Sequence, residues 1–144
     1  MHAFPISASD DEIKSSVVDW SELLAQQRFG DALTMFPPAA ESEMTPTRLA
    51  RWIANYGADD EFPDGRVFAV TSLRALPQFA DIVSRRIEVD RENLYSLDPN
   101  DYVGMVHYSD VPLDGKPSDL TARFYIKQMG NDRITLEFLD IHVM

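Results

Sequence analysis

Hydrophobic positions in the first part of the chain recur with the spacing of amphipathic helices. Ser9 and Glu12 have the spacing of a capping box, which marks the beginning of a helix. The apolar positions that follow are three or four residues apart: Ile13, Val17, Trp20 and Leu24. This stripe predicts a helix that reaches roughly residue 28, and a short helical segment over residues 32–36 ends at Pro37 and Pro38.

A third helix is predicted between two clear end signals. Thr45 is a suitable N-cap residue, and Pro46 occupies the first helical position, where proline is tolerated. Gly57 follows the last apolar position, where a glycine can end a helix in the left-handed conformation. The pattern therefore predicts a helix from Pro46 to Tyr56.

The second half of the chain has the alternating pattern of β-strands. Strands are predicted over four segments: 67–71, 86–90, 102–109 and 120–127. A turn at residues 130–132 then leads into a last alternating stretch that begins at Arg133. The apolar residues change parity after Phe138, which predicts either a β-bulge or a terminal stretch buried on its other face. Residues 72–83 have no clear pattern because Pro77 interrupts any helix.

Helices followed by an antiparallel meander indicate an α+β fold. We expect one domain over residues 1–144, with helices mainly in 10–56 and sheet mainly in 86–143, and with the sheet curved around the N-terminal helices. The aromatic residues of the helical segments are expected to form the helix–sheet core, with a ligand pocket as the alternative. They are Trp20, Phe29, Phe36, Trp52 and Tyr56.

Composition and charge exclude several classes of function. The net charge is −11, from 24 acidic and 13 basic residues, and this argues against a nucleic-acid-binding protein. The chain has no Cys, so thiolate catalysis and Cys-based metal sites are excluded. No apolar stretch is long enough for a transmembrane helix and no signal peptide is evident, so we expect a cytoplasmic protein that does not bind membranes. The glycines form no phosphate-binding loop, and we expect neither a cofactor nor a metal.

Residues 20–36 resemble the opening of proteins of the NTF2-like (cystatin-like) superfamily. A second set of segments is similar to small uncharacterised bacterial proteins of that architecture: Ile53-Ala54-Asn55-Tyr56-Gly57, Ser118–Ala122 and Leu139–Met144. The resemblance implies a cone in which a strongly bent antiparallel sheet surrounds a pocket. It brings no catalytic signature with it. Some small acidic bacterial proteins of this size are immunity proteins against toxins, which is an analogy of class only.

Asp140 and His142 are two residues apart on a predicted strand, so both side chains point to one face. A carboxylate beside an imidazole can orient it and raise its basicity, as in a general base. With His107 from another strand, this pair is the candidate catalytic centre of an isomerase or hydratase, with Tyr108 or Tyr125 polarising the substrate. The alternative is a polar strand end with a local structural role.

An acidic segment after the third predicted helix is the candidate partner-binding site. Its carboxylates belong to Asp59, Asp60, Glu61 and Asp64. They are expected either to attract a basic protein partner such as a toxin, or only to keep the protein soluble. We therefore expect a non-catalytic binding module of the kind represented by immunity-type inhibitors. The alternatives are the small-molecule enzyme and a structural module that forms a homodimer.

Overall fold

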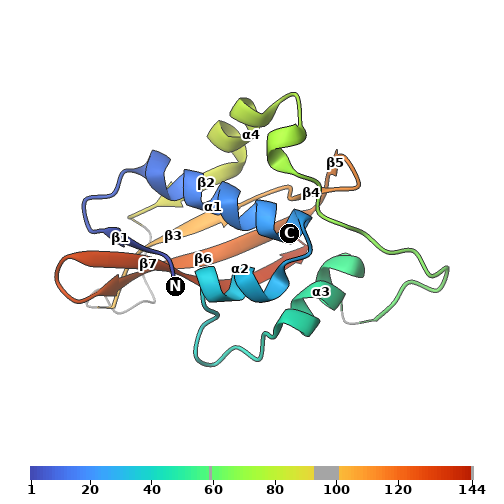
Figure 1. Cartoon of the computed structure of the whole chain (residues 1–144), viewed down its shortest axis with the longest axis horizontal. Helices are drawn as coiled ribbons and strands as arrows, with labels where there is room; N and C mark the ends of the chain where they lie inside the picture. Colours follow the sequence, from blue (N-terminus) through green and yellow to red (C-terminus); the bar gives the residue numbers. More distant parts are fainter. Residues whose placement is uncertain (59, 93–100, 144) are drawn as a thin grey trace.

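The computed structural model describes residues 1–58, 60–92 and 101–143 (Figure 1). In this part of the chain, four α-helices pack against a strongly curled antiparallel sheet of five strands, which gives the expected α+β fold. The helices are α1 (Asp10–Ala25), α2 (Phe29–Met35), α3 (Pro46–Ala54) and α4 (Phe79–Arg86), with a short 3-10 helix at Leu73–Ala75. The strands of the sheet are β1 (Ala3–Pro5), β2 (Ile87–Asp90), β3 (Tyr102–Tyr108), β6 (Leu120–Met129) and β7 (Arg133–Val143).

The two helices with predicted caps begin where the sequence indicates. The Ser9 hydroxyl accepts a hydrogen bond from the Glu12 amide at 3.1 Å, and the Thr45 hydroxyl accepts one from the Arg48 amide at the same distance. Each bond satisfies an amide that the helix itself leaves without a partner. The α3 helix ends at Ala54, and Tyr56 and Gly57 then both adopt left-handed backbone conformations.

The strands of the main sheet lie in the order β1-β7-β6-β3-β2, and every neighbouring pair is antiparallel. The predicted parity change in β7 is confirmed as a bulge, because Phe124 pairs with Phe138 while Arg123 pairs with Asp140. A second register shift lies in β3 between Tyr102 and Gly104. Bulges bend a strand and increase its twist, so these two irregularities help to curl the sheet.

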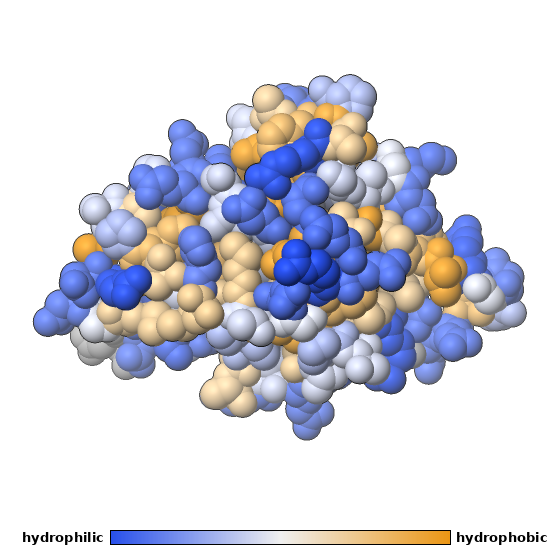
Figure 2. Space-filling model, in the orientation of Figure 1, coloured by the Kyte–Doolittle hydropathy of each residue, from blue (hydrophilic) through white to orange (hydrophobic). Residues whose placement is uncertain are grey.

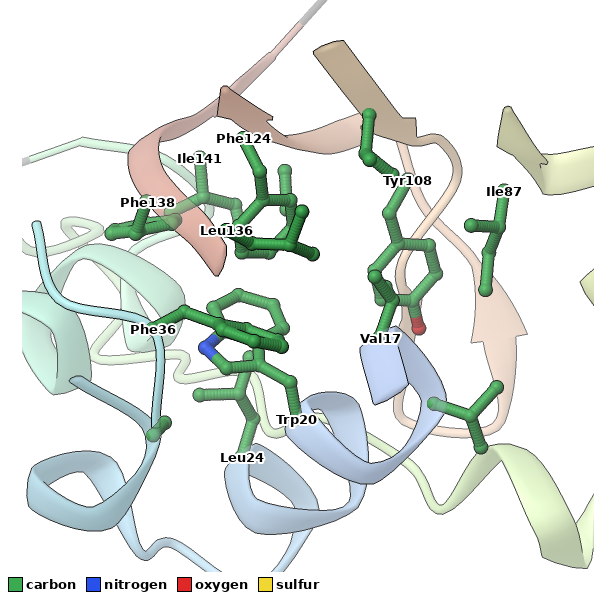
Figure 3. Close-up of a cluster of buried hydrophobic side chains, with 14 of the residues drawn as sticks. Val17, Trp20, Leu24, Phe36, Ile87, Tyr108, Phe124, Leu136, Phe138 and Ile141 are labelled. Atoms are coloured by element: carbon green, nitrogen blue, oxygen red, sulfur yellow. The ribbon is translucent and has the colours of Figure 1, made fainter. Parts of the chain in front are cut away.

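The helices cover one face of the sheet, and the hydrophobic core lies between them. Trp20 of α1 is fully buried and meets Phe124 of β6 with 4.9 Å between ring centroids. Phe36, which follows α2, packs against the same ring at 5.7 Å. Figure 3 shows Trp20 and Phe36 facing the side chains of β6 and β7. The core role expected for these two aromatic residues is therefore confirmed, whereas Phe29, Trp52 and Tyr56 are only half-buried at its margin.

Several segments differ from the expectation. Residues 67–71 form no strand, and only Val70 makes an isolated bridge, to Leu113. The β4 (Pro112–Leu113) and β5 (Lys116–Pro117) pair forms a separate small hairpin, with its turn at Asp114 and Gly115. The patternless stretch around Pro77 contains the 3-10 helix and most of α4. None of the helices in the described ranges has the length and hydrophobicity of a membrane span.

Candidate functional site

The face of the sheet that points away from the helices carries the three residues proposed for catalysis. In the register of the sheet, Glu88, His107, Arg123 and Asp140 form one row across β2, β3, β6 and β7. Residues of the opposite parity on the two central strands, such as Val106 and Phe124, point inward and are fully buried. His107 and Asp140 are thus separated by the strand that carries Arg123. The pocket hypothesis needs them on the inner face, and the structure places them on the outer one.

Asp140 is held by Arg123 and His142 together. The Arg123 Nε and one Nη atom donate to the two Asp140 oxygens at 2.9 and 2.6 Å, which is a bidentate pair. The His142 Nδ1 atom lies 3.1 Å from the Asp140 Oδ1 atom. The expected contact between Asp140 and His142 is therefore present. Arg123 was not predicted as part of this group, because its pairing with Asp140 depends on the bulge in β7.

The arginine determines the charge state of Asp140. Burial on its own would raise the pKa of Asp140, but the hydrogen bonds and charge of Arg123, with a contribution from His142, hold that pKa below its usual range. Hydrogen bonding to Asp140 likewise raises the pKa of Arg123. A carboxylate stabilised in this way orients its partners and takes up a proton less readily. The group therefore has the properties of a fixed ion pair, and a catalytic role for it stays a prediction.

Replacing Asp140 with Asn is expected to destabilise the protein at neutral pH and to matter less in acid. Because the folded pKa of Asp140 lies below its unfolded value, its stabilising effect is fully present above about pH 4 and is lost as the pH falls through the folded pKa. We expect a loss of up to about 1 kcal/mol at pH 7, since the pair is partly exposed. Urea unfolding of both proteins between pH 2 and pH 7 measures this. Asp132→Asn, at an exposed turn, controls for the loss of a negative charge. If the stability difference between the wild type and Asp140→Asn grew as the pH fell, the stabilising role of ionised Asp140 would be contradicted.

The acidic segment lies after α3 and is held in place by aromatic rings. Asp59 lies outside the described residues, whereas Asp60, Glu61 and Asp64 are exposed. The Arg66 guanidinium lies over the rings of Phe62 and Phe68, at 5.4 and 4.9 Å from their centroids. None of the three described carboxylates has an ion-pair partner among the residues that the structure describes. Their charges are therefore available to a partner.

An apolar groove lies beside this acidic segment and was not predicted. It has a volume of about 300 Å³ and lies between the end of α1, α2, α3 and the chain at positions 67–70. Its lining residues are Leu24, Gln27, Phe29, Ala50, Ile53, Ala54, Val67, Phe68, Ala69 and Val70. Phe68 belongs both to the groove and to the ring cluster under the acidic segment, so the two features adjoin. Val67 is 64% exposed at the groove edge, and Figure 2 shows apolar surface next to hydrophilic surface at this end of the molecule.

Metal-binding side chains do not gather in the described part of the chain: no group of three or more His, Asp or Glu residues there could hold an ion.

Comparisons with models of protein families, with curated proteins and with solved structures found no match. The roles of the site residues are therefore argued from the geometry of this chain alone.

Proposed function

We propose that the protein is a non-catalytic binding module that docks a basic polypeptide in the groove beside the acidic segment. The observation that carries this proposal is that an apolar groove adjoins Asp60, Glu61 and Asp64, three exposed carboxylates that have no ion-pair partner among the described residues. Phe68 lines the groove and packs 5.7 Å from Phe62, which directly follows Asp60 and Glu61 in the chain. A partner segment can therefore bury an apolar side chain and place Lys or Arg beside the carboxylates at the same time.

The two halves of this surface have different physical roles. The groove offers apolar side chains that gain from being removed from water, which supplies affinity. The acidic segment, on a protein of net charge −11, attracts a basic partner over a distance of about 10 Å and speeds association. An immunity-type inhibitor that captures a basic toxin belongs to this class of protein.

The NTF2-like assignment is part of the same proposal. Its support is the curled antiparallel sheet with helices packed on one face. In this chain the space between helices and sheet is filled by Trp20, Phe36 and Phe124, all fully buried. Docking at an outer groove is therefore a better fit to the packing than binding within a central pocket.

The alternative of a small-molecule enzyme is favoured by one observation, the 3.1 Å contact between His142 Nδ1 and Asp140 Oδ1. It leaves the second ring nitrogen of His142 available as a base. Against it stand the bidentate pairing of Asp140 with Arg123 and the position of the group on the outer face of the sheet. We therefore favour a binding function over a catalytic one.

A selection of random displayed peptides tests the proposed function, because it reads out the chemistry of the partner without naming one. We expect the wild-type protein to enrich peptides that combine Lys or Arg with large apolar residues. The variant Asp60→Lys/Glu61→Lys/Asp64→Lys is expected to bind the enriched peptides at least about tenfold more weakly, since three favourable charges become unfavourable. Fluorescence anisotropy at low and high salt measures this loss.

The control variant is Glu88→Lys/Glu92→Lys/Asp132→Lys, which changes the net charge equally at exposed positions outside the groove. A specific docking surface predicts that this control keeps most of the affinity. Equal losses in the two variants would mean that only the overall charge of the protein attracts basic peptides. Enrichment of acidic or purely apolar peptides would contradict the proposal.

A further inference from the structure

A second hollow lies on the outer side of β6 and β7, away from the groove. Its volume is about 200 Å³. The loop after α2 forms one wall, because Pro37 and Ala39 bond to the backbone of Phe138 and so extend the sheet beside β7. The lining includes Pro37, Pro38, Lys127, Met129, Leu136 and Glu137. Apolar groups thus dominate a hollow whose charged side chains are those of Glu137 and Lys127.

The carboxylate of Glu137 is the unusual feature of this hollow. Its side chain is only 9% exposed, although it lies on the outer face of the sheet. The Tyr102 hydroxyl donates to one oxygen at 3.1 Å, and the Lys127 ammonium lies 3.2 Å from the other. An ionised carboxylate can accept about four hydrogen bonds, so these two partners leave it capacity for a further donor.

Other carboxylates lie near the Tyr102 hydroxyl that donates to Glu137. Burial raises the pKa of Tyr102 to about 12, and the carboxylates of Glu137, Glu41 and Asp101 add to that rise. Tyr102 also packs against Tyr125 at 5.1 Å between centroids, which fixes its hydroxyl on Glu137. Three carboxylates from three segments therefore act on Tyr102, and the Lys127 side chain that pairs with Glu137 is 44% exposed.

We propose that this hollow receives a lysine or arginine side chain of the partner polypeptide, with the stem against Pro37, Pro38 and Met129 and the charged end on Glu137. Lysine and arginine combine an apolar stem with a cationic end, which is the combination that the walls and the carboxylate offer. The inference rests on the proposed function for the class of partner only. It assigns that partner a contact which the groove does not supply.

Small amino-acid amides test the hollow without the groove. Amide chemical shifts of the labelled protein are followed during titration with N-acetyl-arginine amide, and N-acetyl-citrulline amide serves as the neutral probe of the same shape. We expect the arginine probe to shift the signals of Lys127, Met129, Leu136 and Glu137. The citrulline probe is expected to bind at least about tenfold more weakly, because it lacks the charge that pairs with the carboxylate.

Two variants are expected to change binding of the arginine probe in opposite directions. Glu137→Gln keeps the shape and the acceptor for Tyr102 but removes the charge, and it is expected to lose most of the preference for arginine over citrulline. Lys127→Met keeps the stem but removes the competing cation, and it is expected to bind the arginine probe several-fold more tightly. The matched control is Asp132→Asn, which removes a carboxylate at the exposed turn and leaves the hollow intact.

Equal binding of the two probes would overturn the inference, and so would unchanged arginine binding in Glu137→Gln or weaker binding in Lys127→Met. Shifts confined to the acidic segment after α3 would overturn it too, but would leave the proposed function standing. If the displayed basic peptides do not bind but binding of the arginine probe still depends on Glu137, the docking groove is contradicted and the inference about the hollow stands.

Discussion

Replacing Trp20 with Ala is expected to lower the free energy of unfolding by about 3–5 kcal/mol. Trp20 is fully buried, and its ring contacts Phe124 at 4.9 Å and Phe138 at 5.4 Å between centroids. Truncation removes the largest buried side chain between α1 and the sheet and leaves a cavity that the curled strands cannot close. The loss is a large part of the total stability of an ordinary domain, which is about 5–15 kcal/mol. Urea unfolding followed by far-ultraviolet circular dichroism measures it.

The second tryptophan provides the matched control for this variant. Trp52 of α3 is only half-buried, and the Arg48 guanidinium lies over its ring at 5.7 Å. Trp52→Ala is expected to cost about 1–2 kcal/mol, because less apolar surface becomes exposed to water and the cation–π contact is weak at a partly exposed site. Equal losses for the two variants would show that the helices do not pack on the sheet as described.

Replacing Gly104 with Ala is expected to destabilise the protein by about 1–3 kcal/mol. A methyl group at Gly104 would lie 2.7 Å from the Ile126 Cδ1 atom and 2.8 Å from the backbone oxygen of Asp90. The isoleucine side chain can adjust, but the backbone oxygen belongs to the paired strand β2 and can move only if the pairing changes. Gly104 also follows the register shift in β3, so the substitution acts where the sheet bends.

Gly30→Ala is the control for this substitution. Gly30 lies in α2 on an exposed surface, and the nearest atom to an added methyl group is a proline carbon at 3.9 Å. Alanine favours the helical conformation over glycine by about 0.5–1 kcal/mol, so this variant is expected to be neutral or more stable. A Gly104→Ala protein as stable as the wild type would contradict the close approach of β2 and β3.

Features that depend on neighbouring residues could be predicted from the sequence. The caps at Ser9 and Thr45 could be predicted because each joins residues only three positions apart. The bulge in β7 could be predicted because a strand must keep one face apolar, and the parity of its apolar residues changes after Phe138. By contrast, β1 was missed because three residues are too few to show an alternation.

The candidate site depends more strongly on contacts between distant segments. The Asp140–His142 contact is local and was expected. The pairing of Asp140 with Arg123, by contrast, depends on the register of two strands across a bulge. The strand predicted at residues 67–71 is wrong because that segment runs along the groove with only one bridge. The acidic segment could be recognised from charge alone, whereas the groove beside it is formed by three helices and could not.

The most direct test of the docking surface is to map where a basic amphipathic peptide binds. A peptide enriched in the display selection is titrated into isotope-labelled protein while amide chemical shifts are recorded. The account predicts that the largest changes fall on Asp60, Glu61, Asp64 and the groove residues Val67 and Phe68, and that added salt weakens them. Shifts spread evenly over the acidic surface, or centred on His107 and His142, would contradict it.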